Sequence, residues 1–188
     1  MAKKSPHTAR IGFVISPHSN NSFFLKGQKN LKRCQCGELL SRECDLSEFR
    51  LKKKRDISAS EDSELFASDH FRQFWLEIGG DGLVFEPLPS QPGYYHLVFT
   101  DILEFDSVRR MSRSEDYRPC CQRYFAFVGA TPAYLKRSEA LKGNHAYRTD
   151  LEFGSGDGKS PLLIVGLDVG LKLKASKLTG LCLDDVLA

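Results

Sequence analysis

Cysteines are the residues of this chain whose type and spacing most clearly suggest chemistry. Four of the six cysteines form two close pairs, Cys34 with Cys36 and Cys120 with Cys121. A structural zinc ion is usually held by four soft ligands in two such pairs, so these four residues are the predicted metal ligands. The spacers of one and zero residues are shorter than the usual two, and Cys44 could replace a member of either pair. The alternative is that these thiols are buried or idle.

Other motifs that could support catalysis are incomplete. Gly154–Ser160 resembles a phosphate-binding loop, but that motif needs a glycine where this chain has Phe153. Pro161 also removes an N–H group where a phosphate-binding helix should begin, so we expect a surface hairpin turn. The five histidines lack the paired spacing of a zinc hydrolase, and no serine lies in a nucleophile-elbow context. We therefore predict that the chain is not an enzyme.

Charge is divided unevenly along the chain. Residues 1–55 carry 13 lysines and arginines against 4 acidic residues, whereas residues 56–188 carry 14 against 20. A basic segment can bind nucleic acid or another acidic partner, and it can also be only a solvated arm. No apolar run approaches the roughly 18 residues of a membrane-spanning helix, and the basic start lacks the apolar stretch of a signal peptide. We expect a cytoplasmic protein that does not bind membranes.

The elements that position these residues include a unit that occurs twice. Residues 65–87 and 163–184 both show the pattern of a short strand, a helix, a glycine-bounded stop and a second short strand. At an offset of 98 residues, Phe71 aligns with Val169, Trp75 with Leu173, and Gly82 with Gly180. The aromatic stripe of Phe71, Phe74 and Trp75 is expected to face the core, because aromatic residues at helical spacing usually do so.

We interpret the chain as one compact α+β domain in which two strand–helix–strand units pack with a β-rich region that holds the zinc knuckle. Its segments are a basic head with the first cysteine pair (1–56), the first unit (57–92), a β-rich segment with the second pair (93–130), and a helix followed by the second unit (131–188). The final segment is expected to begin with a helix from Thr131 to about Leu141, because proline suits a first helical turn. Residues 109–118 are expected to form a loop, and Cys182 to be a core residue of an apolar strand.

Six short motifs follow one another along the chain: Arg33–Gly37, Cys44–Ser47, Gly82–Phe85, Pro119–Arg123, Tyr147–Arg148 and Leu178–Leu181. In this order they resemble the bacterial double-CxxCG-motif proteins, which are placed among the immunity proteins of contact-delivered polymorphic toxins. The resemblance covers about residues 30–186. Both cysteine pairs are compressed relative to the CxxC of the family, and Gln122 stands where the family has glycine after the second pair.

The resemblance implies a non-enzymatic immunity-type protein that binds and neutralises a cognate protein toxin. The acidic residues 56–188 would suit a basic nuclease toxin. The alternative is a zinc-knuckle module that binds nucleic acid through its basic N-terminal third. Such a module needs aromatic side chains interleaved with its basic residues, and these are sparse in this segment: Phe23, Phe24 and Phe49.

Overall fold

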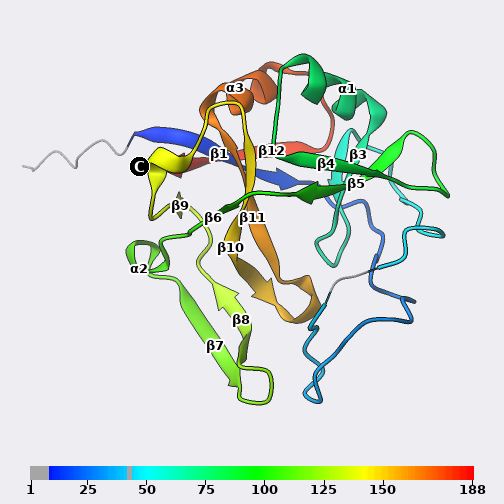
Figure 1. Cartoon of the computed structure of the whole chain (residues 1–188), viewed down its shortest axis with the longest axis vertical. Coiled ribbons are helices and arrows are strands. Elements are labelled where there is room, and N and C mark those ends of the chain that lie inside the picture. Colours follow the sequence, from blue (N-terminus) through cyan, green and yellow to red (C-terminus); the bar gives the residue numbers. More distant parts are fainter. Residues whose placement is uncertain (1–8, 42–43) are drawn as a thin grey trace, which may run out of the picture.

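The computed structural model describes residues 9–41 and 44–188, so the first eight residues of the predicted basic head, with residues 42 and 43, lie outside it. The strands are β1 (Arg10–Pro17), β2 (Ile57–Ala59), β3 (Leu65–Ser68), β4 (Leu83–Pro87), β5 (Tyr94–Phe99), β6 (Ile102–Leu103), β7 (Arg113–Arg118), β8 (Arg123–Val128), β9 (Ala133–Tyr134), β10 (Ala146–Ser155), β11 (Ser160–Gly166) and β12 (Leu181–Leu187). The helices are α1 (Asp69–Glu77), α2 (Ser107–Arg110) and α3 (Leu167–Ala175), with 3₁₀ turns η1 (Ser138–Ala140) and η2 (Gly156–Gly158). The fold is α+β, as expected (Figure 1).

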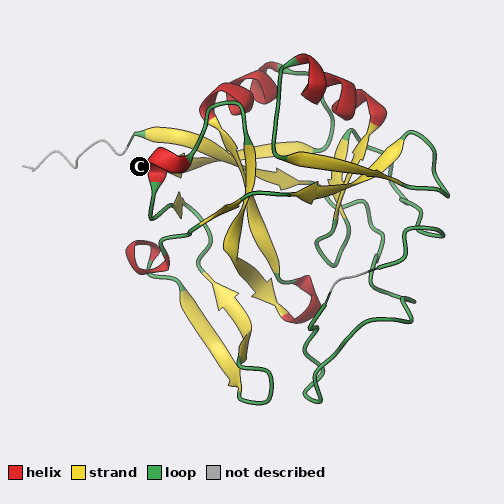
Figure 2. Ribbon diagram, in the orientation of Figure 1, coloured by secondary structure: helices red, strands yellow, loops and turns green. Residues whose placement is uncertain are grey.

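Two sheets organise the described residues. The larger has the strand order β7-β8-β10-β11-β1-β12-β9, with β6 added beside β10, and the smaller has the order β2-β3-β5-β4. Helices α1 and α3 lie together over one side of the molecule, whereas the β7–β8 hairpin extends away from them (Figure 2). None of the helices among the described residues is long and apolar enough to cross a membrane.

The internal repeat is larger than the strand–helix–strand unit expected from the sequence. Strands β2-β3-β5-β4 of the smaller sheet correspond to β10-β11-β1-β12 of the larger one. Val165 of β11 pairs with Phe13, just as Ala67 of β3, which lies 98 positions earlier, pairs with Tyr95. On the other side of each central strand, Leu183 pairs with Ile15 and Phe85 pairs with Leu97. Each unit is therefore a four-stranded sheet with one helix.

The central strands are exchanged between the two halves of the chain. Strand β1 opens the first half but lies between β11 and β12, whereas β5 follows the first unit along the chain and lies between β3 and β4. The turns after the helices are exchanged as well. The N–H of Ile57 donates to the carbonyl of Thr179 at 3.2 Å, and the equivalent N–H of Ala146 donates to that of Asp81 at 2.9 Å. Each four-stranded unit therefore takes its central strand from the other half of the chain.

Both long helices cover one shared core. The Ser68 hydroxyl accepts a hydrogen bond from the Phe71 N–H and caps α1, which satisfies an N–H group that the first turn leaves unpaired. Phe71 and Trp75 of α1 pack in the same apolar cluster as Val169 and Leu173 of α3. All four side chains are at most 1 % exposed, so the predicted core role of the aromatic stripe is confirmed for Phe71 and Trp75.

The helix predicted over residues 131–141 is wrong. Ala133 and Tyr134 form β9, which pairs with the end of β12, and only the 3₁₀ turn η1 follows. Ala133 is fully buried and Leu135 is 5 % exposed, so packing of both side chains favours extended backbone over the helical preference of the sequence.

Residues 109–118 were predicted to form a loop, but they form the end of α2 and all of β7.

Cys182 is also not a core residue. It lies on β12 and is exposed, and its Sγ atom is 3.1 Å from Nε2 of His18. Alternation explains the error, because neighbouring side chains of a strand point to opposite faces and Leu181 and Leu183 occupy the inward positions.

Because the two turns are exchanged, we expect Gly82→Ala and Gly180→Ala each to lower the free energy of unfolding by much more than Gly27→Ala does. All three glycines have positive φ, where an alanine costs about 1–2 kcal/mol. A Cβ at Gly82 or Gly180 would also lie 2.2 or 2.1 Å from the carbonyl oxygen of Ala146 or Ile57, whereas Gly27 has nothing within 4 Å. Urea unfolding measures the difference, and equal losses for all three variants would contradict the reciprocal close contact.

Candidate metal centre

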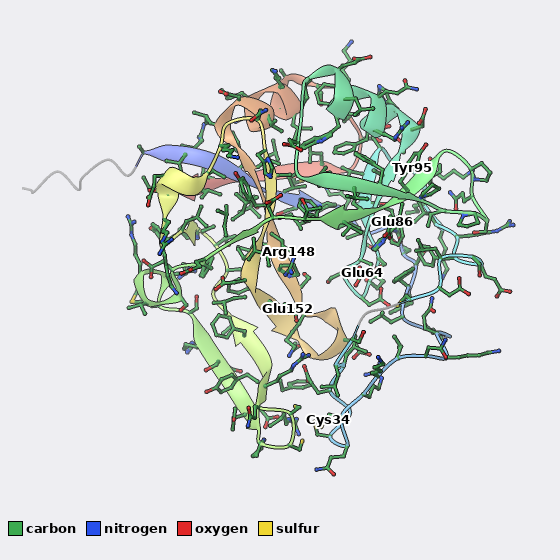
Figure 3. The ribbon with its side chains drawn as sticks, viewed as in Figure 1. Cys34, Glu64, Glu86, Tyr95, Arg148 and Glu152 are labelled. Carbon is green, nitrogen blue, oxygen red and sulfur yellow. The ribbon has the colours of Figure 1, made fainter. Side chains whose placement is uncertain are left out.

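The structure brings the four predicted cysteine ligands together. All four Sγ atoms lie within 4.8 Å of one another. The two pairs contact each other, with Sγ of Cys34 3.3 Å from that of Cys120 and Sγ of Cys36 3.8 Å from that of Cys121. The first pair lies in the segment between β1 and β2, and the second in the turn between β7 and β8. Figure 3 shows Cys34 at the end of the molecule opposite the long helices.

A tight turn presents the first pair. The N–H of Gly37 donates to the carbonyl of Cys34 at 2.9 Å, and the N–H of Cys34 donates to the carbonyl of Glu38 at 2.8 Å. Gly37 has a φ of +87°, a conformation that glycine adopts without steric cost. The chain therefore reverses directly after Cys36, and both thiols project from the same end of the turn.

A hairpin turn presents the second cysteine pair. Arg118 pairs with Arg123, and Cys120, Cys121 and Gln122 lie in the connection between them. Gln122 has a φ of +56°, in the left-handed region that usually favours glycine. The chain therefore turns directly after Cys121, as it does after Cys36.

The donor set fits a tetrahedral metal ion. Four thiolates at the usual zinc–sulfur distance of about 2.3 Å lie about 3.8 Å from one another. The observed separations lie close to this value, because each pair comes from its own turn and the two turns face each other. The short spacers within each pair therefore do not keep the four sulfurs apart. The four cysteines could hold a metal ion, and four protein ligands would leave no open position for catalysis.

The thiols differ in acidity. The pKa of Cys36 is lowered to about 7, first by a hydrogen bond with the Glu38 backbone and then by hydrogen bonds with neighbouring thiols. The pKa of Cys120 is raised to about 12 by hydrogen bonds with Cys34 and Cys36, and that of Cys121 is raised by desolvation and by Cys36. Cys36 therefore ionises readily, and its negative charge opposes ionisation of the neighbouring thiols. A bound divalent cation would offset this repulsion between thiolates.

A buried ion pair holds the first cysteine turn in place. Nζ of Lys159 contacts Oε1 of Glu38, and the two side chains are 9 % and 5 % exposed. The same ammonium group donates to the Tyr124 carbonyl at 2.7 Å, and Arg123 donates to the Leu39 carbonyl at 2.7 Å. These contacts tie the turn of Cys34 and Cys36 to strand β8 and so to the second cysteine pair. Sequence reasoning missed this pair, because no local pattern connects residues 38 and 159.

The segment Gly154–Ser160 is confirmed as a turn between two antiparallel strands. It ends β10, forms η2 and starts β11, and Lys159 within it binds Glu38. Arg33, which directly precedes Cys34, forms an exposed ion pair with Asp157 of the same turn. Its two guanidinium nitrogens lie 2.7 and 2.8 Å from the two carboxylate oxygens. The glycine-rich sequence therefore positions the cysteine loop.

The remaining candidate residues lie elsewhere. Cys44 packs beside the apolar cluster of Phe24 and Phe66 and is not a member of the four-thiol group. Phe24, one of the sparse aromatic residues of the basic segment, is 2 % exposed, and Phe49 packs against it with ring centroids 4.9 Å apart. Phe23 is the member of this aromatic set that stays exposed, at 53 %.

Removing one partner of the buried ion pair should destabilise the protein strongly. Lys159→Met leaves the Glu38 carboxylate buried without its cation, so the free energy of unfolding should fall by about 3–5 kcal/mol. Asp157→Asn breaks the exposed pair between the same two segments and should cost about 1 kcal/mol or less. Denaturant unfolding compares the two variants. A loss for Lys159→Met no larger than that for Asp157→Asn would show that the buried pair does not hold the cysteine loop.

No family model, no curated protein and no solved structure matches this chain.

Proposed function

We propose that the four cysteines bind a structural zinc ion and that the protein is a non-enzymatic immunity-type protein that neutralises a cognate toxin by direct binding. The observation that carries the proposal is the gathering of Cys34, Cys36, Cys120 and Cys121 into one group. The sequence resemblance implied a zinc site at these cysteines, and Gly37 and Gln122, which follow the two pairs, both have positive φ.

The β7–β8 hairpin is the proposed toxin-binding surface. Its exposed apolar side chains are Tyr117, Tyr124 and Phe125, which are 49 %, 43 % and 40 % exposed. In the preceding helix α2, Val108 is 85 % exposed, and Met111 at its C-terminal end is 79 % exposed. Arg118 lies over the Phe125 ring at 5.3 Å. Aromatic residues, methionine and arginine are enriched in the energetically dominant parts of protein interfaces.

The metal centre would stiffen this surface. The second cysteine pair forms the tip of the β7–β8 hairpin, and the first pair lies across from it on a loop clamped by Glu38 and Lys159. A metal ion bound by both pairs would hold the hairpin against the loop. A surface ordered before binding loses less conformational entropy on association.

Elemental analysis of protein purified without chelator or affinity metal tests the zinc site. We expect about one zinc ion per chain, lost in the double variant Cys34→Ser, Cys120→Ser, and a lower melting temperature on chelation. Cys182→Ser removes an exposed thiol outside the group and should keep the metal. A metal-free protein with all six thiols reactive would overturn the assignment.

Capture of a partner from the native cell tests the toxin-binding role. The wild-type chain should recover a protein partner in stoichiometric amount, and the partner should lose toxicity when the two are co-expressed. Tyr117→Ala should weaken the complex about tenfold or more, because aromatic anchors dominate interface energies. Leu171→Ala removes an equally exposed apolar side chain from α3 and serves as the control.

Two results would count against this role. One is a chain that never recovers a stoichiometric partner from its native cell. The other is tight binding of nucleic acid that weakens steeply with salt, which is the signature of phosphate contacts and would favour the basic N-terminal third as the functional surface.

A further inference from the structure

A cavity of about 660 Å³ lies between the two repeated units. Leu65 of β3 and Leu163 of β11, which occupy equivalent positions in the repeat, both line it. The central strands also contribute equivalent residues, Leu97 from β5 and Ile15 from β1. The cavity therefore lies where the two units face each other. Its volume is within the range of about 300–1,000 Å³ that is typical of small-molecule sites.

Most charged side chains around the cavity already have partners. Lys159 is paired with Glu38, and His96 lies 3.1 Å from Glu64. Burial of His96 disfavours its charged form, but hydrogen bonds with Glu64 and Glu86 outweigh this effect and raise its pKa. These groups therefore already have charged partners within the protein.

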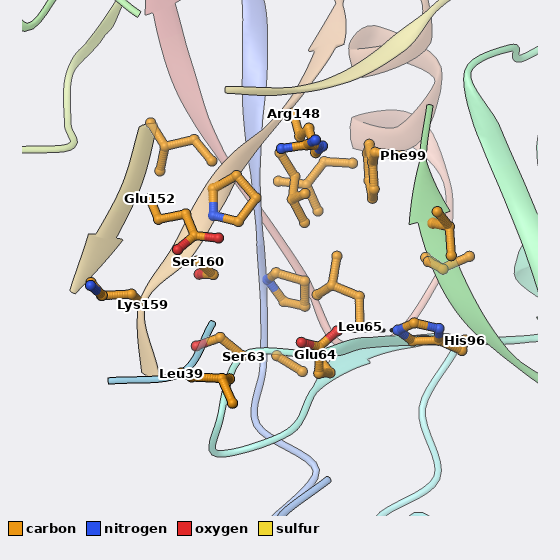
Figure 4. Close-up of a pocket in the computed structure, with 18 of the residues that line it drawn as sticks. Leu39, Ser63, Glu64, Leu65, His96, Phe99, Arg148, Glu152, Lys159 and Ser160 are labelled. Carbon is orange, nitrogen blue, oxygen red and sulfur yellow. Dashed lines mark hydrogen bonds and ion pairs between the residues drawn. The ribbon is translucent and has the colours of Figure 1, made fainter. Parts of the chain in front are cut away.

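Arg148 and Glu152 are different. Both belong to β10 and both line the cavity, as Figure 4 shows. Within the described residues, neither side chain makes a hydrogen bond or an ion pair, although each has several donors or acceptors. Arg148 is partly buried and Glu152 is exposed. The register of β10 against β11 shifts between the two residues, so that Arg148 pairs with Leu163 and Glu152 with Pro161. Such irregularities commonly redirect side chains beside functional sites.

We propose that this cavity binds a small zwitterion of the amino-acid or short-peptide class. The Arg148 guanidinium would take the carboxylate through two parallel hydrogen bonds, and Glu152 would take the ammonium group. The apolar walls of Leu65, Leu163 and Phe99 would take an apolar side chain. A ligand with one charge would leave the other protein charge without a partner, which is why a zwitterion fits better than a simple anion or cation.

The proposed ligand contacts are separate from those of the proposed immunity function. They use neither the four cysteines nor the exposed face of the β7–β8 hairpin, although Glu38 and Lys159, which hold the turn of Cys34 and Cys36, also line the cavity. Loss of toxin binding would leave the cavity intact, and an empty cavity would leave toxin binding unaffected. The two proposals can therefore fail separately.

Titration calorimetry with the full chain tests the proposal. The probes are L-leucine, L-phenylalanine and the dipeptide L-leucyl-L-leucine, each compared with an analogue lacking the ammonium group and one lacking the carboxylate. We expect saturable binding of at least one zwitterion, with both analogues about tenfold weaker or worse, because each loses a charge-assisted contact. Binding of none of the three zwitterions would overturn the proposal.

Variants of Arg148 and Glu152 test whether ligand binding depends on these two side chains. Arg148→Gln should weaken the zwitterion about tenfold or more and remove the preference over the carboxylate-free analogue. Glu152→Gln should remove the preference over the ammonium-free analogue. Arg137→Gln changes an exposed arginine outside the cavity and should bind as the wild type does. Because a misfolded variant would also lose binding, circular dichroism and melting temperature are measured for each. Unchanged affinity in folded Arg148→Gln and Glu152→Gln would place the ligand elsewhere and sink the proposal.

Discussion

The rest of the structure depends on the exchange of two central strands. Strand β1 completes the unit made by the second half of the chain, and β5 completes the unit made by the first half. Neither half can bury its apolar sheet face alone, because its own central strand lies in the other unit. The shared core of Phe71, Trp75, Val169 and Leu173 joins the units further. Exchange and shared burial therefore connect the two halves at their sheets and at their helices.

The two cysteine pairs follow the same internal symmetry. In each half, the pair lies after the central strand and before the hairpin that leads to the long helix, and the two pairs meet. Their meeting gives the halves a contact point far from the helices. The buried pair of Glu38 and Lys159 supports that contact from the side. Core packing, strand exchange and the thiol group thus connect the same two halves at different places.

Local patterns made part of this structure predictable from sequence. Helical spacing and a glycine stop identified α1 and α3, and close pairing of cysteines identified the four thiols. Distant contacts determined the rest. The exchange of β1 and β5 is invisible because strand pattern does not specify a partner, and the helix expected at 131–141 gave way to pairing of β9 with β12. Glu38 and Lys159 form an ion pair only through the fold that brings them together.

The position of β1 has a consequence for how the chain acquires its structure. Arg10 pairs with Leu187 and Gly12 with Gly166, so β1 finds its partners far along the chain. Closing so long a loop costs chain entropy, and proteins rich in such distant pairings fold slowly. The apolar side chains of Phe13 and Ile15 stay uncovered until β11 and β12 pair with β1. The pairing of these distant strands therefore ends a period in which the exposed apolar surface favours aggregation.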